Sequence, residues 1–422
     1  MKRWGPHAVR VPSRIAWMFA DQLVASASNF GFVAVAAHAL RPRDFGVLTL
    51  TYTVIVFANQ LLEAAIAEPL LVRATRGLTK DAPAAVATIT LVIGTALGLG
   101  WVAVAWSTSD SSAMLLGTAL CVPWLLVQNA LRYAAVAADR AVLAFISDLT
   151  WIALQAPLAW LVLVDPSVSR EAVLLAWAAP GAVSCLPLLV GLRCRISLSA
   201  AGTFARRAGD LSRAYVAESL VFALNIHGIY FIVGFVSDVT QAGALRAAQS
   251  LFGPLSVVYS LIRTVGIAEL AKAERDRALL ARRAILVSVA AVAMSGAYCG
   301  GLLLLPDQVG TFLFSSLWLS ASVLVAPLAV RSIFVGAGTA TVAALRAAEL
   351  VRATVTARIG SALLSFVVVL ASATLWGARG AAWGVAVAAA ISWMWFEIVL
   401  GAPHAGRRTA SDEHRRLAEA RS

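Results

Sequence analysis

The chain has 422 residues, a mean hydropathy of +0.82, 60% hydrophobic residues and only 13% charged residues. Soluble domains are about half apolar and about a quarter charged, so this composition excludes an ordinary soluble enzyme and indicates that the chain folds in lipid. The 34 Lys and Arg exceed the 22 Asp and Glu, giving a formal net charge of +12. Nucleic acid is not needed to explain that excess, because membrane proteins retain basic residues in their cytoplasmic loops.

Twelve runs of the sequence are apolar over about the 20 residues that a membrane-spanning helix needs. They cover residues 15–40, 45–72, 83–106, 113–137, 141–164, 171–192, 214–237, 242–268, 284–305, 317–345, 355–376 and 380–401. The pattern predicts an all-α polytopic membrane protein with about 12 transmembrane helices. The segments between the runs are too short to hold a soluble catalytic domain.

The Lys and Arg residues are distributed unevenly over the connecting segments. If the N-terminus is cytoplasmic, 28 of the 34 lie on the cytoplasmic side, 4 lie outside, and Arg246 and Arg331 lie within spans. Because cytoplasmic loops carry the excess of basic residues, this bias predicts a multi-pass protein of the cytoplasmic membrane with both termini in the cytoplasm.

The two halves of the chain resemble each other at a shift of 197 residues. The shift pairs Asp21 with Glu218 and Gly46 with Gly243, among other matches. Because six spans separate the copies, the two halves run in the same direction, and the interface between them is the expected substrate path. We therefore expect an N-terminal six-helix lobe (1–192), a cytoplasmic linker loop (193–213), a C-terminal six-helix lobe (214–401) and a cytoplasmic tail (402–422).

Several segments, in this order, resemble those of one family. They are ADQLVASASNF in the first span, RPRDFG at 41–46, EPLLVR at 68–73, LLPDQVG at 304–310 followed by Trp318, and GAAWG at 380–384. The chain resembles the Wzx-like polysaccharide and O-antigen flippases of the multidrug/oligosaccharidyl-lipid/polysaccharide (MOP) superfamily, whose other members include MATE exporters. Many such flippases have fourteen spans, whereas this sequence has twelve apolar runs.

The resemblance implies two lobes in a V that open alternately to the two sides of the membrane. It also implies a substrate, an oligosaccharide repeat unit linked to undecaprenyl pyrophosphate, which is moved to the outer leaflet for surface polysaccharide synthesis. Glycosyltransferases and a polysaccharide polymerase would be its partners. The protein would then be a transporter without a cofactor or resident metal, and coupling to Na⁺ or H⁺ is left open.

Arginines within the spans are the first candidates for contact with a pyrophosphate. Arg331 lies near the bilayer centre, where an arginine costs roughly 2.5–3.5 kcal/mol. Its planar guanidinium suits phosphate oxygens; the alternative is an ion pair with Glu63 or Glu218. Arg246 and Arg132 are further candidates, although each could lie near enough to a helix end to reach the interface. The other basic residues near helix ends, among them Arg358, are interpreted as topology charges.

Polar residues in the first and seventh spans form the second group of candidates. Asp21 and Glu218 occupy equivalent repeat positions and could couple transport to an ion. Asn29, Asn225 and His227 could contact sugar hydroxyls. The alternative for all five is hydrogen bonding between helices, which small and polar stripes commonly support in membranes.

Glu63 and Glu68 close the second span, and Pro69 follows Glu68. Proline removes a backbone donor, so a gate or hinge is one interpretation, and a plain helix end at the interface is the favoured one.

Two other functions remain open at this point. One is a cation-coupled exporter of drugs or other small molecules from the same superfamily, indicated by the intramembrane acids. The more distant one is a membrane glycosyltransferase or polymerase, which would need catalytic acids on larger loops. The four cysteines show no spacing typical of a metal site or a disulfide framework.

Overall fold

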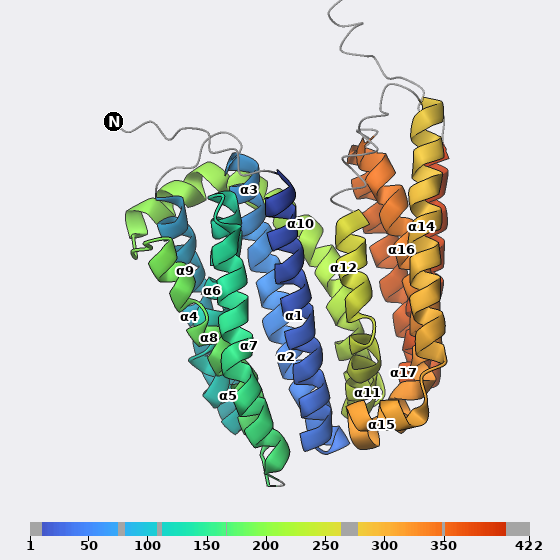
Figure 1. Ribbon diagram of the computed structural model, residues 1–422, viewed down its shortest axis with the longest axis horizontal. Coiled ribbons are helices and arrows are strands. Elements are labelled where there is room, and N and C mark those ends of the chain that lie inside the picture. The colour runs from blue at the N-terminus through green and yellow to red at the C-terminus, as the bar shows by residue number, and fades with distance from the viewer. Residues whose placement is uncertain are drawn as a thin grey trace, which may run out of the picture.

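The computed structural model describes residues 11–74, 81–107, 112–165, 167–262, 277–347 and 351–401, and within these ranges the only regular elements are helices. In Figure 1 the helices form two upright groups, one with α1 to α9 and one with α11 to α17. The first group comprises α1 (Val11–Ala39), α2 (Pro42–Leu62), a π-helical segment η1 (Glu63–Ala67), α3 (Glu68–Ala74), α4 (Ala82–Ser107), α5 (Ser112–Ala119), α6 (Val122–Ala137), α7 (Ala141–Val164), α8 (Arg170–Val183) and α9 (Leu186–Gly191). We call it the N-lobe.

The second group, the C-lobe, follows the long helix α10 (Leu198–Val236). It comprises α11 (Val239–Ser250), α12 (Gly253–Leu261), α14 (Arg277–Leu303), α15 (Asp307–Phe314), the 3₁₀ turn η3 (Ser315–Leu317), α16 (Trp318–Ala347) and α17 (Val351–Gly401). α17 has non-helical backbone at Trp376 and Gly377, so it is two helices joined by a kink. Gly377 has a φ of 59°, a conformation that glycine adopts without the strain of a side chain.

Nine helices within the described ranges are long and apolar enough to cross a membrane. The last of them, Thr354–Leu400, belongs to α17, which contains both expected spans 355–376 and 380–401 and is kinked where they adjoin. The expected first span is present as α1, of which Leu23–Ala39 is a shorter apolar helix. The protein is therefore an all-helical polytopic membrane protein, and the count of twelve stays a prediction.

The eighth expected span, 242–268, differs most from the prediction. It is divided into α11 and α12 by a turn at Leu251 and Phe252, and its last residues lie outside the described ranges. Pro254 stands in the first turn of α12, where its missing N–H costs no helical hydrogen bond. Residues of both pieces, Arg246 and Tyr259 among them, line a cavity described below.

The linker 193–213 was expected to be a loop, and the structure corrects this. Helix α10 already begins at Leu198 and continues without interruption into the seventh span. Ser197 caps its first turn by accepting a hydrogen bond from the Ala200 N–H at 3.3 Å. In Figure 1 the first part of α10 lies across the top of the N-lobe, and the rest descends between the lobes. α10 is thus a shared element that contacts α2 and α4 on one side and α17 on the other.

The expected second span, 45–72, is confirmed by a membrane-length helix over Pro42–Val72, which passes through the π-helical segment and continues to Ala74. Pro69 has no N–H, so the carbonyl of Ala65, four residues earlier, loses its usual donor. The Ser212 hydroxyl of α10 donates to that carbonyl at 2.7 Å. The helix therefore bulges rather than ends, which is the usual accommodation of proline at membrane depth.

The lobes meet at the end of the molecule that holds the turns at 40–41, 237–238 and 304–306, which we call the seam end. There α1 and α2 pack against α11, α15 and η3. Phe30 and Phe314 contact edge to face, with ring centroids 6.3 Å apart. Within the N-lobe, Arg170 and Asp44 form an ion pair of 3.3 Å between the first turns of α8 and α2.

Candidate functional site

Two adjoining cavities lie between the lobes. The C-lobe cavity has a volume of about 620 Å³ and is bounded by α1, α10, α11, α12, α16 and α17. The N-lobe cavity has a volume of about 1170 Å³ and is bounded mainly by α1, α2, α6 and α10. Residues that line both cavities are Ala25, Asn29, Phe222, Ile226, Arg246, Ser256, Val342 and Arg358. The two cavities are therefore parts of one polar space along α10.

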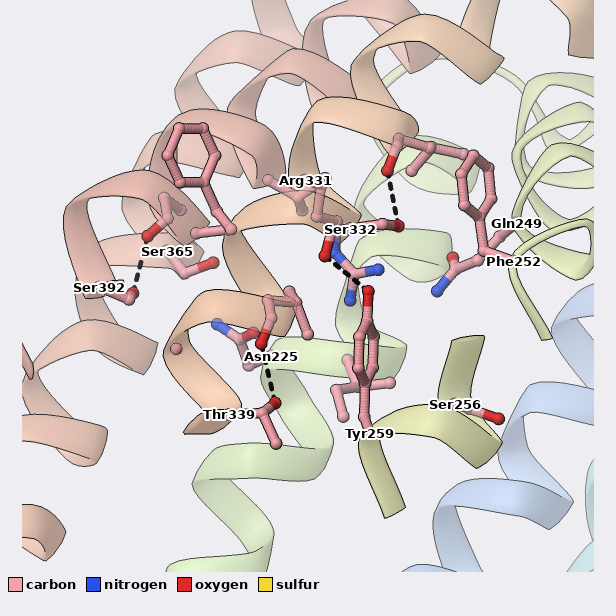
Figure 2. A pocket seen from close by; sticks show the side chains of 18 of the residues that line it. Asn225, Gln249, Phe252, Ser256, Tyr259, Arg331, Ser332, Thr339, Ser365 and Ser392 are labelled. Carbon is pink, nitrogen blue, oxygen red and sulfur yellow. Dashed lines mark hydrogen bonds between the residues drawn. The ribbon is translucent and has the colours of Figure 1, made fainter. Parts of the chain in front are cut away.

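Arg331 lines the C-lobe cavity, as expected from its position in the middle of a span. Figure 2 shows its side chain extending from α16 toward the hydroxyl end of Tyr259 on α12. The Tyr259 hydroxyl is itself held by donation to the backbone oxygen of Ser332 at 2.6 Å. Within the described ranges, no ion pair joins Arg331 to a carboxylate, and its expected alternative partners, Glu63 and Glu218, are bonded elsewhere.

Arg246 stands where the two cavities meet, because it lines both. Its guanidinium carbon lies 4.7 Å from the ring centre of Tyr52 and 6.0 Å from that of Tyr230. Aromatic faces attract a cation without neutralising its formal charge. Its Nε is buried and has no hydrogen-bond partner within the described part of the chain. Arg246 is held in the interior and does not reach a membrane surface.

Arg358, interpreted from the sequence as a topology charge, also lines both cavities. It forms an ion pair of 3.0 Å with Glu218, and its guanidinium lies 5.1 Å from the Phe222 ring centre. Its place three residues into the expected span 355–376 is the sequence signal that could have identified it. The pair joins α10 to α17.

Arg132 lines the N-lobe cavity and is paired with Asp148 of α7 at 2.9 Å. Gln128 donates to the Asp148 carboxylate and to the Ser147 hydroxyl, at 3.0 Å each. A buried carboxylate needs such partners because its desolvation is costly. Arg132 thus has a structural partner in addition to its place on the cavity wall.

Glu63 and Glu68 line the same N-lobe cavity. Glu63 accepts a short hydrogen bond from the Tyr133 hydroxyl of α6. Glu63 is the first residue of the π-helical segment and Glu68 the first residue of α3, and the helix continues past both to Ala74. π-helical segments often occur at functional sites, so a role of Glu63 and Glu68 in gating remains a hypothesis.

Three polar candidates lie on the cavity walls. Asn29 lines both cavities and accepts a hydrogen bond from Tyr52 at 3.0 Å. Asn225 lines the C-lobe cavity and donates to the Ala362 backbone oxygen at 3.2 Å. His227 lines the N-lobe cavity, 2.9 Å from Gln60 Oε1 across the α10–α2 contact. The backbone of Asp21 belongs to α1, whereas its side chain lies outside the described part of the structure.

The two cavities differ in the sign of the side chains that line them. Among the described residues, the lining of the C-lobe cavity includes three arginines, Arg246, Arg331 and Arg358, and no carboxylate. The N-lobe cavity is lined by Glu63, Glu68, Asp148 and Glu218 together with Arg132, Arg246 and Arg358. Carboxylates and cations are therefore mixed in the N-lobe cavity, whereas the charged side chains in the described lining of the C-lobe cavity are all arginines.

No family model matches the sequence, and no curated protein is similar to it in sequence. Solved structures are similar in fold. The lipid II flippase MurJ in an inward closed conformation matches with a TM-score of 0.71 and 12% identity, over 93% of this chain and 88% of that one. An inward-facing multidrug resistance MATE family transporter of the MOP superfamily matches with a TM-score of 0.61 and 13% identity, over 92% and 94% of the two chains.

A third structure, a MOP superfamily transporter from Pyrococcus furiosus Vc1, was reported with a reversed polarity of its binding pocket. It matches with a TM-score of 0.61 and 14% identity over 91% of this chain and 94% of that one. These neighbours are transporters and flippases, not enzymes. At such low identity they show the fold and not the substrate. The chain has the fold of the MOP superfamily transporters.

Proposed function

We propose that this protein is a flippase that moves a lipid-linked oligosaccharide, joined through a diphosphate, across the cytoplasmic membrane by alternating access. The observation that carries the proposal is the C-lobe cavity, whose lining among the described residues includes Arg246 and Arg331 and no carboxylate. A diphosphate is the costliest part of such a substrate to take through hydrocarbon. Guanidinium groups stabilise phosphate oxygens by charge-assisted and often bidentate hydrogen bonds.

The position of these arginines between two lobes suits transport better than permanent binding. Arg246 belongs to α11, which contacts the N-lobe helix α2 at the seam end, whereas Arg331 belongs to α16. A change in the angle between the lobes would alter access to both guanidinium groups. The fold likeness to a lipid II flippase supports a lipid-linked substrate. We further propose twelve spans, cytoplasmic termini, and glycosyltransferases and a polymerase as functional partners.

A cation-coupled drug exporter is the second candidate. It is favoured by Glu63, Glu68 and Glu218 on the N-lobe cavity and by the likeness to MATE transporters. Those acids could bind H⁺ or Na⁺ in either function. A cationic drug would be repelled by the C-lobe cavity, whose lining among the described residues holds three arginines and no carboxylate, although Arg358 is paired with Glu218 on the neighbouring cavity.

Deleting the gene in the producing bacterium is the primary test. We expect lipid-linked oligosaccharide to accumulate in the inner leaflet and surface polysaccharide to be lost. Arg331→Ala and Arg246→Ala should fail to restore export, whereas Arg206→Ala, which removes an exposed arginine of α10 outside both cavities, should restore it. Unchanged surface polysaccharide would exclude the proposal, and increased sensitivity to cationic drugs would favour the exporter.

A further inference from the structure

One wall of the C-lobe cavity is built by α16 and α17 and combines aromatic rings with hydroxyl groups. Its residues are Phe334, Thr339, Ser365, Ser392 and Trp393, which we call the α16–α17 wall. None of them is charged, so the wall does not add to the diphosphate binding that the arginines would supply. Figure 2 shows Thr339, Ser365 and Ser392 around the same space as Arg331 and Asn225. The arginines therefore do not explain why aromatic and hydroxyl side chains line this wall.

Two hydroxyl groups of the wall, those of Thr339 and Ser392, donate their protons within their own helices. Thr339 donates to the Val335 carbonyl of its own helix at 2.8 Å, and Ser392 donates to the Ala388 carbonyl at 2.7 Å. A hydroxyl has one donor and two acceptor lone pairs, so the oxygens of these residues remain available as acceptors. The wall therefore suits a ligand that carries many hydroxyl donors.

The aromatic part of the wall is held in a defined orientation. The rings of Phe334 and Trp393 lie 5.7 Å apart, tilted by 36°. The Trp393 indole N–H donates to Glu397 at 3.2 Å, and the same Glu397 oxygen accepts from Thr341 at 2.7 Å. An oriented ring of this kind offers a broad apolar face at little entropic cost. The apolar C–H face of a pyranose is complementary to it, while its hydroxyls reach the acceptors nearby.

The wall lies at the right distance from the arginines. Phe334 and Thr339 follow Arg331 on the same helix by 3 and 8 residues. At a rise of 1.5 Å per residue these offsets correspond to about 5 and 12 Å along the axis. A diphosphate held at Arg331 would thus place the sugar bonded to it beside Phe334 and the next sugar near Thr339.

We propose that the α16–α17 wall is a saccharide subsite that binds the first one or two neutral sugars attached to the diphosphate. The inference rests on the proposed function, because the arginines fix where the saccharide begins. It assigns Trp393 and Phe334 to stacking on the sugar ring, and Thr339, Ser365 and Ser392 to accepting hydrogen bonds from its hydroxyls. Recognition of sugar and diphosphate is then divided between different residues of one cavity.

Binding to the purified full-length protein in nanodiscs tests this division. The probes are undecaprenyl diphosphate alone and undecaprenyl diphosphate carrying one hexose, one N-acetylhexosamine or one deoxyhexose. At least one glycosylated probe should bind the unmodified protein about tenfold more tightly than the sugar-free probe. Trp393→Ala and Thr339→Val should abolish this difference without changing the affinity for the sugar-free probe. Arg331→Ala should weaken the binding of every probe.

Matched controls separate a subsite from a loss of folding. Trp383→Ala removes an exposed tryptophan of α17, and Thr374→Val an exposed threonine of α17, neither on a cavity wall. Both should leave the tenfold difference intact, and Trp393→Phe should retain part of it. If all probes bind the unmodified protein equally, or if Trp393→Ala weakens all probes equally, the subsite is wrong. If none of the probes binds, the proposed function itself fails.

Discussion

Gly46 of α2 and Gly243 of α11 contact each other across the seam between the lobes. A Cβ atom on Gly243 would lie 3.1 Å from the Gly46 Cα, and one on Gly46 would lie 2.2 Å from the backbone oxygen of Val239. The two glycines are separated by 197 residues, the shift that relates the halves of the sequence. The contact brings together two positions that the shift pairs, as expected if the two halves are related by a two-fold axis that passes near these glycines.

The first prediction concerns that contact. Gly46→Ala should destabilise the protein by about 1–3 kcal/mol, because the added methyl group would overlap backbone that cannot move aside. Thermal unfolding in detergent measures the loss. Gly31→Ala is the matched control, since a Cβ there would meet no atom within 4 Å. Equal melting temperatures for the two variants would show that the lobes do not pack closely at Gly46.

The second prediction concerns Arg132 and Asp148. Arg132→Ala should cost about 3–5 kcal/mol of stability, because it removes the guanidinium from a carboxylate that is 5% exposed. The double variant Arg132→Ala with Asp148→Asn should be more stable than Arg132→Ala alone, since no uncompensated charge remains. Chemical or thermal unfolding of Arg132→Ala, Asp148→Asn and the double variant measures both effects. If the stability loss of the double variant equals the sum of the losses of the two single variants, the ion pair is contradicted.

The third prediction concerns the electrostatics of the cavity at Glu218. Glu218→Gln should tighten the binding of undecaprenyl diphosphate several-fold, because it releases Arg358 from an ion pair of 3.0 Å. Arg358→Ala should weaken the same binding. Asp210→Asn, which removes an exposed carboxylate from the same helix outside both cavities, should change little. Weaker binding by Glu218→Gln would contradict a cationic site for the diphosphate.

The fourth prediction concerns the bulge in the second span. Ser212→Ala should cost about 1 kcal/mol, because the Ala65 carbonyl loses the hydroxyl that bonds it at 2.7 Å. In a Pro69→Ala background the same change should cost less, since the new N–H at position 69 can bond that carbonyl. Unfolding free energies for the four combinations give the coupling between the two sites. Identical costs in both backgrounds would reject this account of the bulge.

The fifth prediction concerns Cys194, which follows α9 outside the described membrane spans. Burial disfavours its thiolate and raises the pKa of the thiol from 9.0 to about 11. At pH 8 the thiolate fraction of Cys194 should therefore be about a hundredfold below that of an ordinary cysteine. Because the thiolate is the reactive form, the alkylation of Cys194 should be slower by the same factor. Alkylation by iodoacetamide, in a variant whose other cysteines are replaced by alanine, should accelerate about tenfold per pH unit up to about pH 11. A plateau above pH 9 would contradict the raised pKa.

The same single-cysteine variant tests the membrane orientation. Cys194 is expected on the cytoplasmic side, so a membrane-impermeant maleimide at high pH should label it in inside-out vesicles and not in right-side-out vesicles. Labelling only from the outside would reverse the proposed topology.

The sequence predicted the membrane class and the positions of most helices, because apolar runs of about 20 residues leave few alternatives to a spanning helix. It also identified Arg331 and Arg246, since a charge at membrane depth is too costly to be accidental. It misplaced elements where local patterns conflict with tertiary contacts. Ser212 and Pro69, for example, are far apart in sequence, so the bulged continuation of the second span could not be expected from either alone.

Hydropathy and charge therefore determined that this chain spans a membrane and which residues carry unusual charges within it. Tertiary structure alone decided which of those charges are neutralised. Arg132 and Arg358 have carboxylate partners from other helices, whereas Arg246 rests on Tyr52 and Tyr230, and Arg331 faces the cavity. The physical reason is that an ion pair depends on a separation of a few ångströms between helices, and the one-dimensional pattern of apolar residues carries no information about that distance.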